Sequence, residues 1–262
     1  MKEKKVLVIW WASARASSNL VPGVFKMEKW DLHAHFLPPI HKINLEGGRA
    51  FWRDARKSGM DGVLVVYHGP KQFGSSYDPR ILHDILVKTK PAGIKFLTGL
   101  EMDSAEGGHV IIPSDDPKKL FKDGDFRRIL TLDELNEKAR EHGGPVILAH
   151  PRTNLGLEYK MHEDKRVSRR LLSEKIAAFG AGTEVKTGLA ESVGQKGHAH
   201  KTIILAGQTT GFVTAGSDAH TSRRIGFTHL ESPFEINSVN DLKKLRGHVQ
   251  MLTRGYDGKH HA

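Results

Sequence analysis

The residues with the clearest chemical potential lie close together near the start of the chain. Asp31, His33 and His35 form a D-x-H-x-H motif, and His41 follows it. In a strand, alternate side chains point to the same face, so these three side chains would point together. Imidazole nitrogens that converge on one point suit a first-row transition metal. For an isolated H-x-H pair, solvated histidines at a strand end would be the favoured interpretation, so a metal site depends on ligands elsewhere in the chain.

Further histidine and acidic residues recur next to apolar runs. Those that follow an apolar run are His68, Glu101, His150, Asp218 and His220, whereas His109 opens one. Packing alone gives no reason for polar residues to recur at strand ends. Enzymes built on β/α barrels place their active sites on the face where the strands end. The spacing therefore predicts that these residues gather at one face of a barrel.

The elements that would position these residues alternate along the chain. Strands are expected at residues 62–66, 94–100, 107–112, 145–149, 182–185, 212–216 and 225–230, and helices at 47–59, 79–89, 131–142, 198–208 and 238–245. Alternating strands and helices indicate βαβ units and a mostly parallel sheet. About seven such units without a linker predict an α/β fold with a closed or nearly closed barrel.

Composition excludes several classes of site. The chain has 262 residues and no cysteine, so disulfides, thiolate metal sites and cysteine nucleophiles are excluded. Any metal must bind to His, Asp or Glu. The net charge of +10 favours anionic partners, either phosphorylated metabolites or nucleic acid, although many surface lysines would give the same value. No apolar run approaches the ~20 residues of a membrane span, so no membrane partner is expected.

The chain divides into three parts. Residues 1–26 are interpreted as an N-terminal extension, 27–250 as the barrel domain and 251–262 as a C-terminal tail. The extension has a basic start, a short apolar run and small residues, which is the outline of a signal peptide. A first strand and a start at Met27 are the other two interpretations. The tryptophans in the short apolar run favour a cytoplasmic protein over an exported one.

Taken together, the motifs resemble those of the PHP (polymerase and histidinol phosphatase) superfamily over roughly residues 29–230. The resemblance rests on D-x-H-x-H, on G-L-E at Glu101, G-H-V at His109, A-H-P at His150 and G-S-D-A-H at Asp218 and His220. It implies a distorted (β/α)7 TIM-like barrel with a metal cluster at the C-terminal ends of the strands. The usual T-D-H of the second motif is replaced here by Val66-Tyr67-His68.

The resemblance also implies a ligand set for two or three divalent ions, zinc, manganese or iron. His33 and His35 would bind a first metal together with Glu101 and Asp218. Glu101 would bridge to a second metal. The remaining implied ligands are His109 and His150 at the second metal and His41, His68 and His220 at a third. Asp31 is expected to support a ligand rather than to bind metal itself.

The implied activity is hydrolysis of a phosphomonoester or phosphodiester, with Glu101, Asp218 and His220 as catalytic residues. Metal ions acidify bound water, so no protein nucleophile is needed. Phosphate contacts are expected from Arg152, Arg223 and Arg224. A site in a barrel mouth favours a small phosphorylated substrate or a nucleic-acid end over the interior of a duplex. The alternatives are a non-catalytic metal-binding or interaction module and another metal-dependent hydrolase, such as an amidohydrolase; the oligomeric state stays open.

Overall fold

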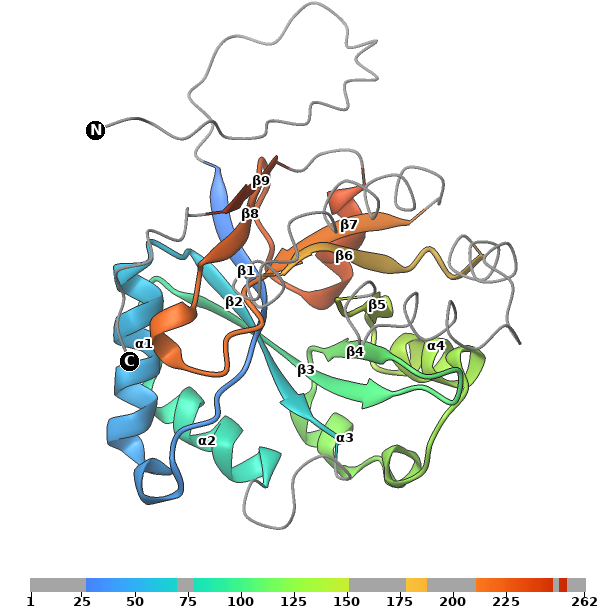
Figure 1. Cartoon of the computed structure of the whole chain (residues 1–262), viewed down its shortest axis with the longest axis horizontal. Helices are drawn as coiled ribbons and strands as arrows, with labels where there is room; N and C mark the ends of the chain where they lie inside the picture. Colours follow the sequence, from blue (N-terminus) through green and yellow to red (C-terminus); the bar gives the residue numbers. More distant parts are fainter. Residues whose placement is uncertain (1–26, 70–77, 151–177, 188–210, 247–249, 254–262) are drawn as a thin grey trace, which may run out of the picture.

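The described residues fold around one mixed sheet of nine strands (Figure 1). The computed structural model describes residues 27–69, 78–150, 178–187, 211–246 and 250–253. The strands follow the order β7-β6-β5-β4-β3-β2-β1-β8-β9. They are β1 (Glu28–Ala34), β2 (Gly62–His68), β3 (Lys95–Asp103), β4 (His109–Ser114), β5 (Ile147–Leu148), β6 (Gly182–Thr187), β7 (Phe212–Gly216), β8 (Thr228–Ser232) and β9 (Gln250–Thr253).

Strand β1 closes this sheet into a barrel because its two halves have different partners. Its first half pairs antiparallel with β8, for example Trp30 with Leu230. Its second half meets the end of β7, where Asp218 N–H donates to the carbonyl of His33 at 2.7 Å. Just beyond β1, the His35 N–H donates to the carbonyl of Ala219 at 3.0 Å. The expected distorted, nearly closed α/β barrel is thereby confirmed.

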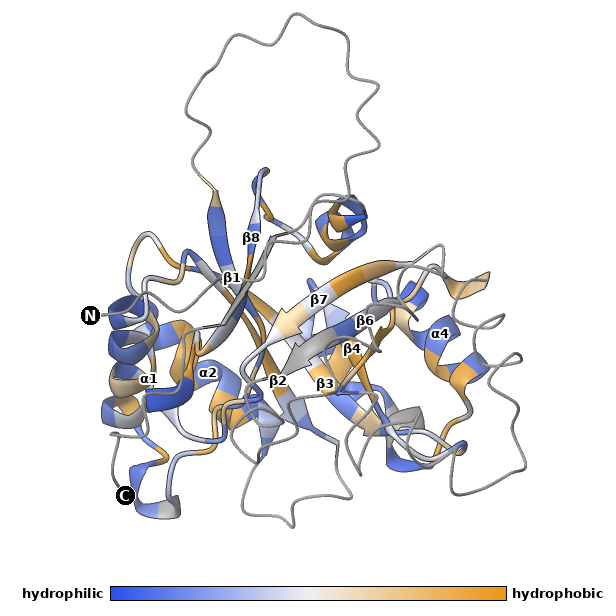
Figure 2. Ribbon diagram, turned by 45° about the horizontal axis from the view of Figure 1, so that its top comes forward, coloured by the Kyte–Doolittle hydropathy of each residue, from blue (hydrophilic) through white to orange (hydrophobic). Residues whose placement is uncertain are grey.

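Two apolar layers follow from the alternation of side chains along β2. Leu64 and Val66 point into the barrel, where they belong to one cluster with Leu32 and Ile111. Val63, Val65 and Tyr67 point outward into a second cluster. That outer cluster takes in the buried faces of helices α1 (Leu45–Lys57) and α2 (Pro79–Thr89), whose other faces are hydrophilic (Figure 2). Because β2 is covered on both faces, its sequence is a continuous apolar run.

Local sequence signals set the helix ends. The Asp78 carboxylate accepts the Arg80 N–H ahead of α2, and Pro79 occupies the first helical position. Thr131 and Glu134 form the expected capping box at the start of α4 (Leu132–Glu141). The shorter helices are α3 (Pro117–Lys122), η1 (Ile40–Lys42), η2 (Gly124–Arg127), η3 (Ser222–Arg224) and η4 (Val239–Leu245), of which those labelled η are 3-10 helices.

The sheet departs from a mostly parallel one at two places. Strand β4 runs antiparallel to both β3 and β5, and β8 runs antiparallel to β1 and β9. The short link of residues 104–108 between β3 and β4 explains the first departure, because a parallel neighbour needs a crossover of a dozen or more residues. The expected strand at 225–230 begins later, at Thr228, and the expected helix at 238–245 is a 3-10 helix.

Some expectations fall on residues outside the described ranges. These are the extension 1–26, the helix at 198–208 and most of the tail. In the described part of the chain, no helix has the length and apolar character that crossing a membrane requires.

Candidate metal centre

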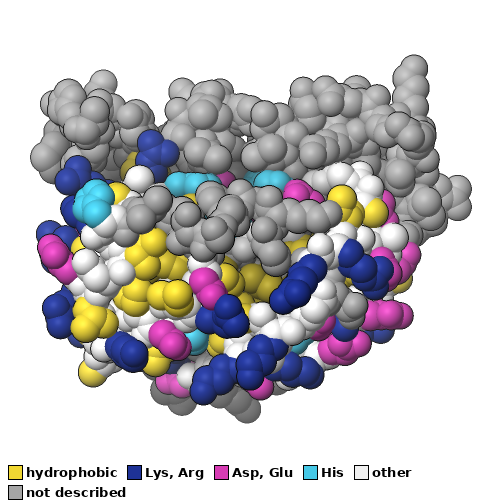
Figure 3. Space-filling view, turned by 90° about the horizontal axis from the view of Figure 1, so that it is seen from below, with side chains coloured by type: hydrophobic (Ala, Val, Ile, Leu, Met, Phe, Trp, Pro, Cys, Tyr) yellow, Lys and Arg dark blue, Asp and Glu magenta, His cyan; other side chains and the backbone are white. Residues whose placement is uncertain are grey.

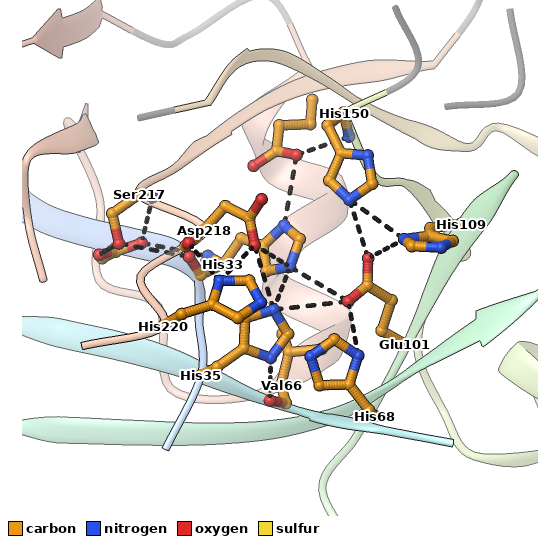
Figure 4. A network of polar contacts seen from close by, with 12 residues as sticks. His33, His35, Val66, His68, Glu101, His109, His150, Ser217, Asp218 and His220 are labelled. Atoms are coloured by element: carbon orange, nitrogen blue, oxygen red, sulfur yellow. Dashed lines mark hydrogen bonds and ion pairs between the residues drawn. The ribbon is translucent and has the colours of Figure 1, made fainter. Parts of the chain in front are cut away.

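The strand ends bring most of the predicted polar residues to one place (Figure 4). His68 continues the inward-facing row of Leu64 and Val66 at the end of β2, and Glu101 continues the row of Leu97 on β3. His109 begins β4, but β4 is antiparallel to β3, so its start lies at the same edge and pairs with Asp103. The fold thus explains why this histidine opens its strand while the others close theirs.

Glu101 joins two groups of histidines through its two carboxylate oxygens. Oε1 lies 2.9 Å from His109 Nδ1 and 3.0 Å from His150 Nε2. Oε2 lies 3.4 Å from His35 Nε2, 3.4 Å from His68 Nδ1 and 3.7 Å from His33 Nε2. With 1% of its side chain exposed, Glu101 is buried between the two groups. A carboxylate in this position can bridge two cations.

His33, His35 and Asp218 form a second compact group. The Nε2 atoms of His33 and His35 lie 3.1 Å apart, and Asp218 Oδ1 lies 3.2 Å from His35 Nε2. Two imidazole lone pairs repel at this distance unless one nitrogen carries a proton or both face a cation. The other nitrogen of His35, Nδ1, donates to the carbonyl of Val66 at 2.8 Å, which leaves the lone pair on Nε2.

A third group consists of His35, His68 and His220. The rings of His35 and His68 stack with centroids 4.1 Å apart. His220 lies over them with 45% of its side chain exposed, and its Nδ1 lies 3.0 Å from the carbonyl of Asp218. His41, expected here, is exposed on η1 and belongs to none of the three groups found among the described residues. The third member of this group is His35 and not the predicted His41.

The charges of the centre depend on one another. Burial alone would raise the pKa of Glu101, but the neighbouring histidines, His33 foremost, hold it well below its usual range. Burial is likewise outweighed at Asp218, where His33 and then His35 lower the pKa to about 2. Burial opposes a charge on His33, yet Glu184, Asp218 and Glu101 raise its pKa well above the ordinary value. The site therefore holds ionised carboxylates that require positive charge beside them.

Backbone strain is concentrated at the same place. Among the described residues other than glycine, only His150 and Asp218 have a positive φ, at 27° and 49°. Such backbone is costly for residues with a Cβ and persists where the surrounding structure holds it. By strand alternation His150 would point away from the inward-facing Ala149, and the turn brings its imidazole to Glu101. Strain of this kind clusters at functional sites.

Asp31 supports the centre from below rather than joining it. Its carboxylate accepts the N–H groups of His33, Ser217 and Gly226 and the Ser217 hydroxyl, at 3.2, 2.9, 2.8 and 2.6 Å. Burial raises its pKa to about 6 against these four donors. Asp31 thus ties β1 to the end of β7 directly beneath His33.

Glu184 is a buried residue of the centre that the sequence analysis missed. It lies on β6 with 1% of its side chain exposed. Oε2 lies 3.3 Å from His33 Nδ1 and accepts the His150 N–H at 2.7 Å. Its position inside the expected strand 182–185 is the signal that the sequence offers, whereas Glu101 follows its apolar run.

Among the described residues, no hydrogen bond or ion pair joins the expected phosphate-binding residues Arg223 and Arg224 to the centre, and their role stays a prediction. Arg223 and Arg224 are exposed on η3, which is tied to α1 by the Ser222 hydroxyl donating to Asp54 at 2.6 Å. Arg152 lies outside the described residues. Basic side chains on the face in Figure 3 are interspersed with acidic ones, so on this face the net charge of +10 forms no single patch.

The altered second motif has a structural explanation. Tyr67, which stands where the resembling family has an acidic residue, points outward from β2 into the apolar layer beneath the helices. Its ring packs edge-on to Phe121 with centroids 5.4 Å apart. The tyrosine ring packs in the outer layer, while His68 keeps its inward position (Figure 4).

The donor set fits divalent cations. Three groups of three side chains have ligand atoms within 4.8 Å of one another: His33, His35 and Asp218; Glu101, His109 and His150; and His35, His68 and His220. Imidazole with a few carboxylates suits zinc, manganese or iron, and the ionised carboxylates supply the negative charge that a cation needs. These residues could hold two or three ions.

Comparison with known proteins establishes the fold. No family model matches the sequence, and no curated protein matches it. Among solved structures, PsfC from Pseudomonas syringae PB-5123 has a TM-score of 0.58 at 17% identity, over 87% of this chain and 92% of that one.

Two endonuclease structures are similar over a comparable share of this chain. Endonuclease Q bound to a 27-mer duplex substrate with an abasic lesion at the active site has a TM-score of 0.52 at 17% identity, over 84% of this chain. The lesion-specific endonuclease PfuEndoQ from Pyrococcus furiosus has a TM-score of 0.56 at 15% identity, over 85% of this chain. This chain matches 56% of each endonuclease. The chain thus has the barrel fold of PsfC and of part of endonuclease Q.

Proposed function

We propose that this protein is a metal-dependent phosphoesterase of the PHP type. The observation that carries the proposal is the position of Glu101, whose two oxygens face different groups of histidines at 2.9–3.7 Å. Divalent ions at these groups would activate water and neutralise the charge that develops during displacement at phosphorus. Neutral imidazoles leave much of the metal charge available for that purpose.

The protein's own residues have distinct roles in this proposal. Glu101 and Asp218 supply the ionised carboxylates, and both are almost fully buried. The histidines present lone pairs whose directions are fixed by their other ring nitrogens, as the His35 contact with Val66 illustrates. His220 is the candidate for protonating the leaving oxygen, because it is the most exposed residue of the three groups.

The proposed substrate is a small phosphorylated molecule or a nucleic-acid end. Aromatic residues make up only 7% of the chain, which favours a small substrate over a long stacked strand. One protein of this fold is described with a duplex that carries an abasic lesion at its active site, which favours DNA as the nucleic acid to test. That protein is considerably longer, so its mode of DNA binding is not carried over to this chain.

The test is a substrate panel with the metal-loaded protein. The panel contains an aryl phosphomonoester, an aryl phosphodiester, oligonucleotides with terminal phosphates, duplexes with and without an abasic site, and an aryl amide. Chelation should abolish hydrolysis of the phosphoesters, and Glu101→Gln should do the same. Hydrolysis of the amide alone would support an amidohydrolase instead. Inactivity on every substrate with two or more metals bound would support a non-catalytic module and contradict the proposal.

A further inference from the structure

Glu184 occupies a position that none of the predicted ligands shares. It lies on β6, outside the three groups of candidate ligands, yet one of its oxygens touches members of two of them. Oε2 is 3.3 Å from Nδ1 of His33, and it accepts the backbone N–H of His150 at 2.7 Å. A single oxygen atom therefore joins the group around His33 to the group around Glu101.

The contact with His33 determines which ring nitrogen faces the centre. A carboxylate oxygen accepts, so Nδ1 of His33 must carry the proton in this contact. The lone pair of the neutral ring then lies on Nε2, which faces His35 at 3.1 Å and Asp218 at 3.6 Å. A partner of this kind fixes the tautomer and the ring orientation of a metal-binding histidine.

The contact with His150 holds a strained segment of backbone. His150 has a φ of 27°, which is costly for a residue with a Cβ. The bond from its N–H to Glu184 is buried and goes to a charged group, and such bonds are among the stronger ones in proteins. It secures the turn that places His150 Nε2 3.0 Å from Glu101.

The surroundings of Glu184 favour this dual role over ordinary packing. Glu184 Oε1 is buried without a hydrogen-bond partner among the described residues. The hydrogen-bonding capacity of the side chain alone therefore does not explain its buried position. The pairing of β6 with β7 also shifts register immediately after Glu184, between Glu184 and Lys186. Burying a carboxylate costs desolvation free energy unless positive charge lies close to it. The two imidazoles beside Glu184 can supply such charge when they are protonated or bind a cation.

We propose that Glu184 is a positioning residue of the metal centre, which fixes the Nδ1–H tautomer of His33 and the turn at His150 together. The inference rests on the metal-dependent function proposed above. Removal of the Glu184 carboxylate should therefore weaken metal binding, because His33 and His150 would lose their orientation. The experiments therefore measure zinc affinity and tautomer rather than turnover.

The first experiment compares zinc affinity among four proteins by chelator competition. Glu184→Ala should weaken binding by about 10–100-fold, the usual cost of losing a hydrogen-bond partner behind a ligand. Glu184→Gln keeps an oxygen that can accept from both donors, so its loss should be clearly smaller. Thr183→Val is the matched control, since Thr183 is the buried neighbour on the opposite face of β6 and its hydroxyl has no partner among the described residues. This control should bind zinc like the wild type.

The second experiment reads the tautomer directly. Long-range ¹H–¹⁵N spectra of the zinc-loaded proteins, with the His33 signals identified by their absence in His33→Ala, should show Nδ1–H in the wild type and in Glu184→Gln. In Glu184→Ala the Nδ1–H signal should broaden, because its proton, no longer held by a carboxylate, exchanges faster with water. Thermal melting of each protein separates these effects from unfolding.

The outcomes distinguish this inference from the proposed function. Equal zinc affinity and an unchanged His33 Nδ1–H signal in Glu184→Ala would overturn the role of Glu184 and leave the phosphoesterase proposal intact. A zinc deficit that merely follows the fraction of unfolded protein, and appears equally in Thr183→Val, would also overturn it. Failure of the wild-type protein to bind zinc, manganese or iron would contradict the metal centre itself.

Discussion

The two ends of the candidate metal centre differ in their exposure to solvent. At the inner end, Glu101, His109 and His150 expose 1%, 10% and 4% of their side chains. At the outer end, His220 exposes 45%. Buried ligands have few alternative positions, whereas an exposed ligand can be replaced by water. The inner end is therefore suited to holding a cation firmly, and the outer end to exchanging ligands with a substrate.

The largest effect is expected from Glu101→Gln, because Glu101 serves both ends. The amide keeps the size of the side chain but removes the charge that the surrounding histidines stabilise. We expect a loss of more than one bound metal per chain by elemental analysis. Activity should fall by more than the ~100-fold that marks the upper range for a residue acting only through a ligand.

Asp103→Asn is the matched control for that change. Asp103 lies two residues further along β3 and exposes 42% of its side chain, although it contacts Nε2 of His109 at 3.3 Å. Its substitution removes the charged partner of one ligand only, so metal content should fall less than in Glu101→Gln. If both variants lost metal equally, the bridging position of Glu101 would not be the cause.

The difference between the ends is tested by comparing His109→Ala with His220→Ala. His109 is held by Glu101 at 2.9 Å in a buried site, so its removal leaves a gap that no solvent ligand fills well. We expect a larger loss of metal affinity for His109→Ala than for His220→Ala, and for His109→Ala a loss of more than the ~100-fold that marks the upper range for a residue behind a ligand. Equal losses would show that exposure does not separate the two ends.

The pH dependence of stability should come from the buried carboxylates. The pKa of Asp218 is about 2 in the folded protein, below the ordinary 3.8. Its contribution to the unfolding free energy is therefore complete above pH 3.8 and is lost as the pH falls through 2. For the metal-free protein this amounts to about 2 kcal/mol.

Urea unfolding between pH 4.5 and 2.5 measures this contribution. The wild-type protein should lose stability over this interval more steeply than Asp218→Asn, which lacks the titrating group. His220→Ala, altered at the outer end, should keep the wild-type slope. Parallel slopes for wild type and Asp218→Asn would contradict the assignment.

The smallest expected effects are on stability, in variants that lack one of two serine hydroxyls with hydrogen bonds of equal length. The Ser217 hydroxyl donates to buried Asp31 at 2.6 Å beneath the centre, and the Ser222 hydroxyl donates to Asp54 at 2.6 Å in a partly exposed site. Ser217→Ala should lower the unfolding free energy by about 1.5 kcal/mol and Ser222→Ala by about 0.5 kcal/mol. Chemical denaturation measures both, and a reversed order would remove burial as the explanation.

Much of the fold could be predicted because its local signals agree with its tertiary structure. The helix of Pro79–Thr89 has its cap and its proline in the sequence, and the capping box of Thr131 and Glu134 forms as expected. The direction of β4 could not be predicted in this way, since an apolar strand has the same alternation in either direction. The pairing of β1 with both β7 and β8 could not be predicted either, because it depends on contacts between residues far apart in the sequence.

The site could be predicted where a residue's strand position determines its direction. His68 and Glu101 follow from strand alternation, and the structure places both in the centre. His41 was predicted from the family resemblance, but η1 leaves it exposed. Glu184 was missed because its role depends on a turn at His150 with a positive φ, which no apolar pattern indicates.

The divided pairing of β1 has a consequence for the order of folding. Its contact with β2 spans 32 residues, as between Trp30 and Gly62, whereas the bond from Ser217 to Asp31 spans 186. Closing so long a segment costs more entropy, and contacts of large sequence separation slow folding. We expect β1, β2 and β3 to associate early. The barrel should close only when the end of β7 reaches β1. The ability to bind a cation should then be the last property that the refolding chain acquires.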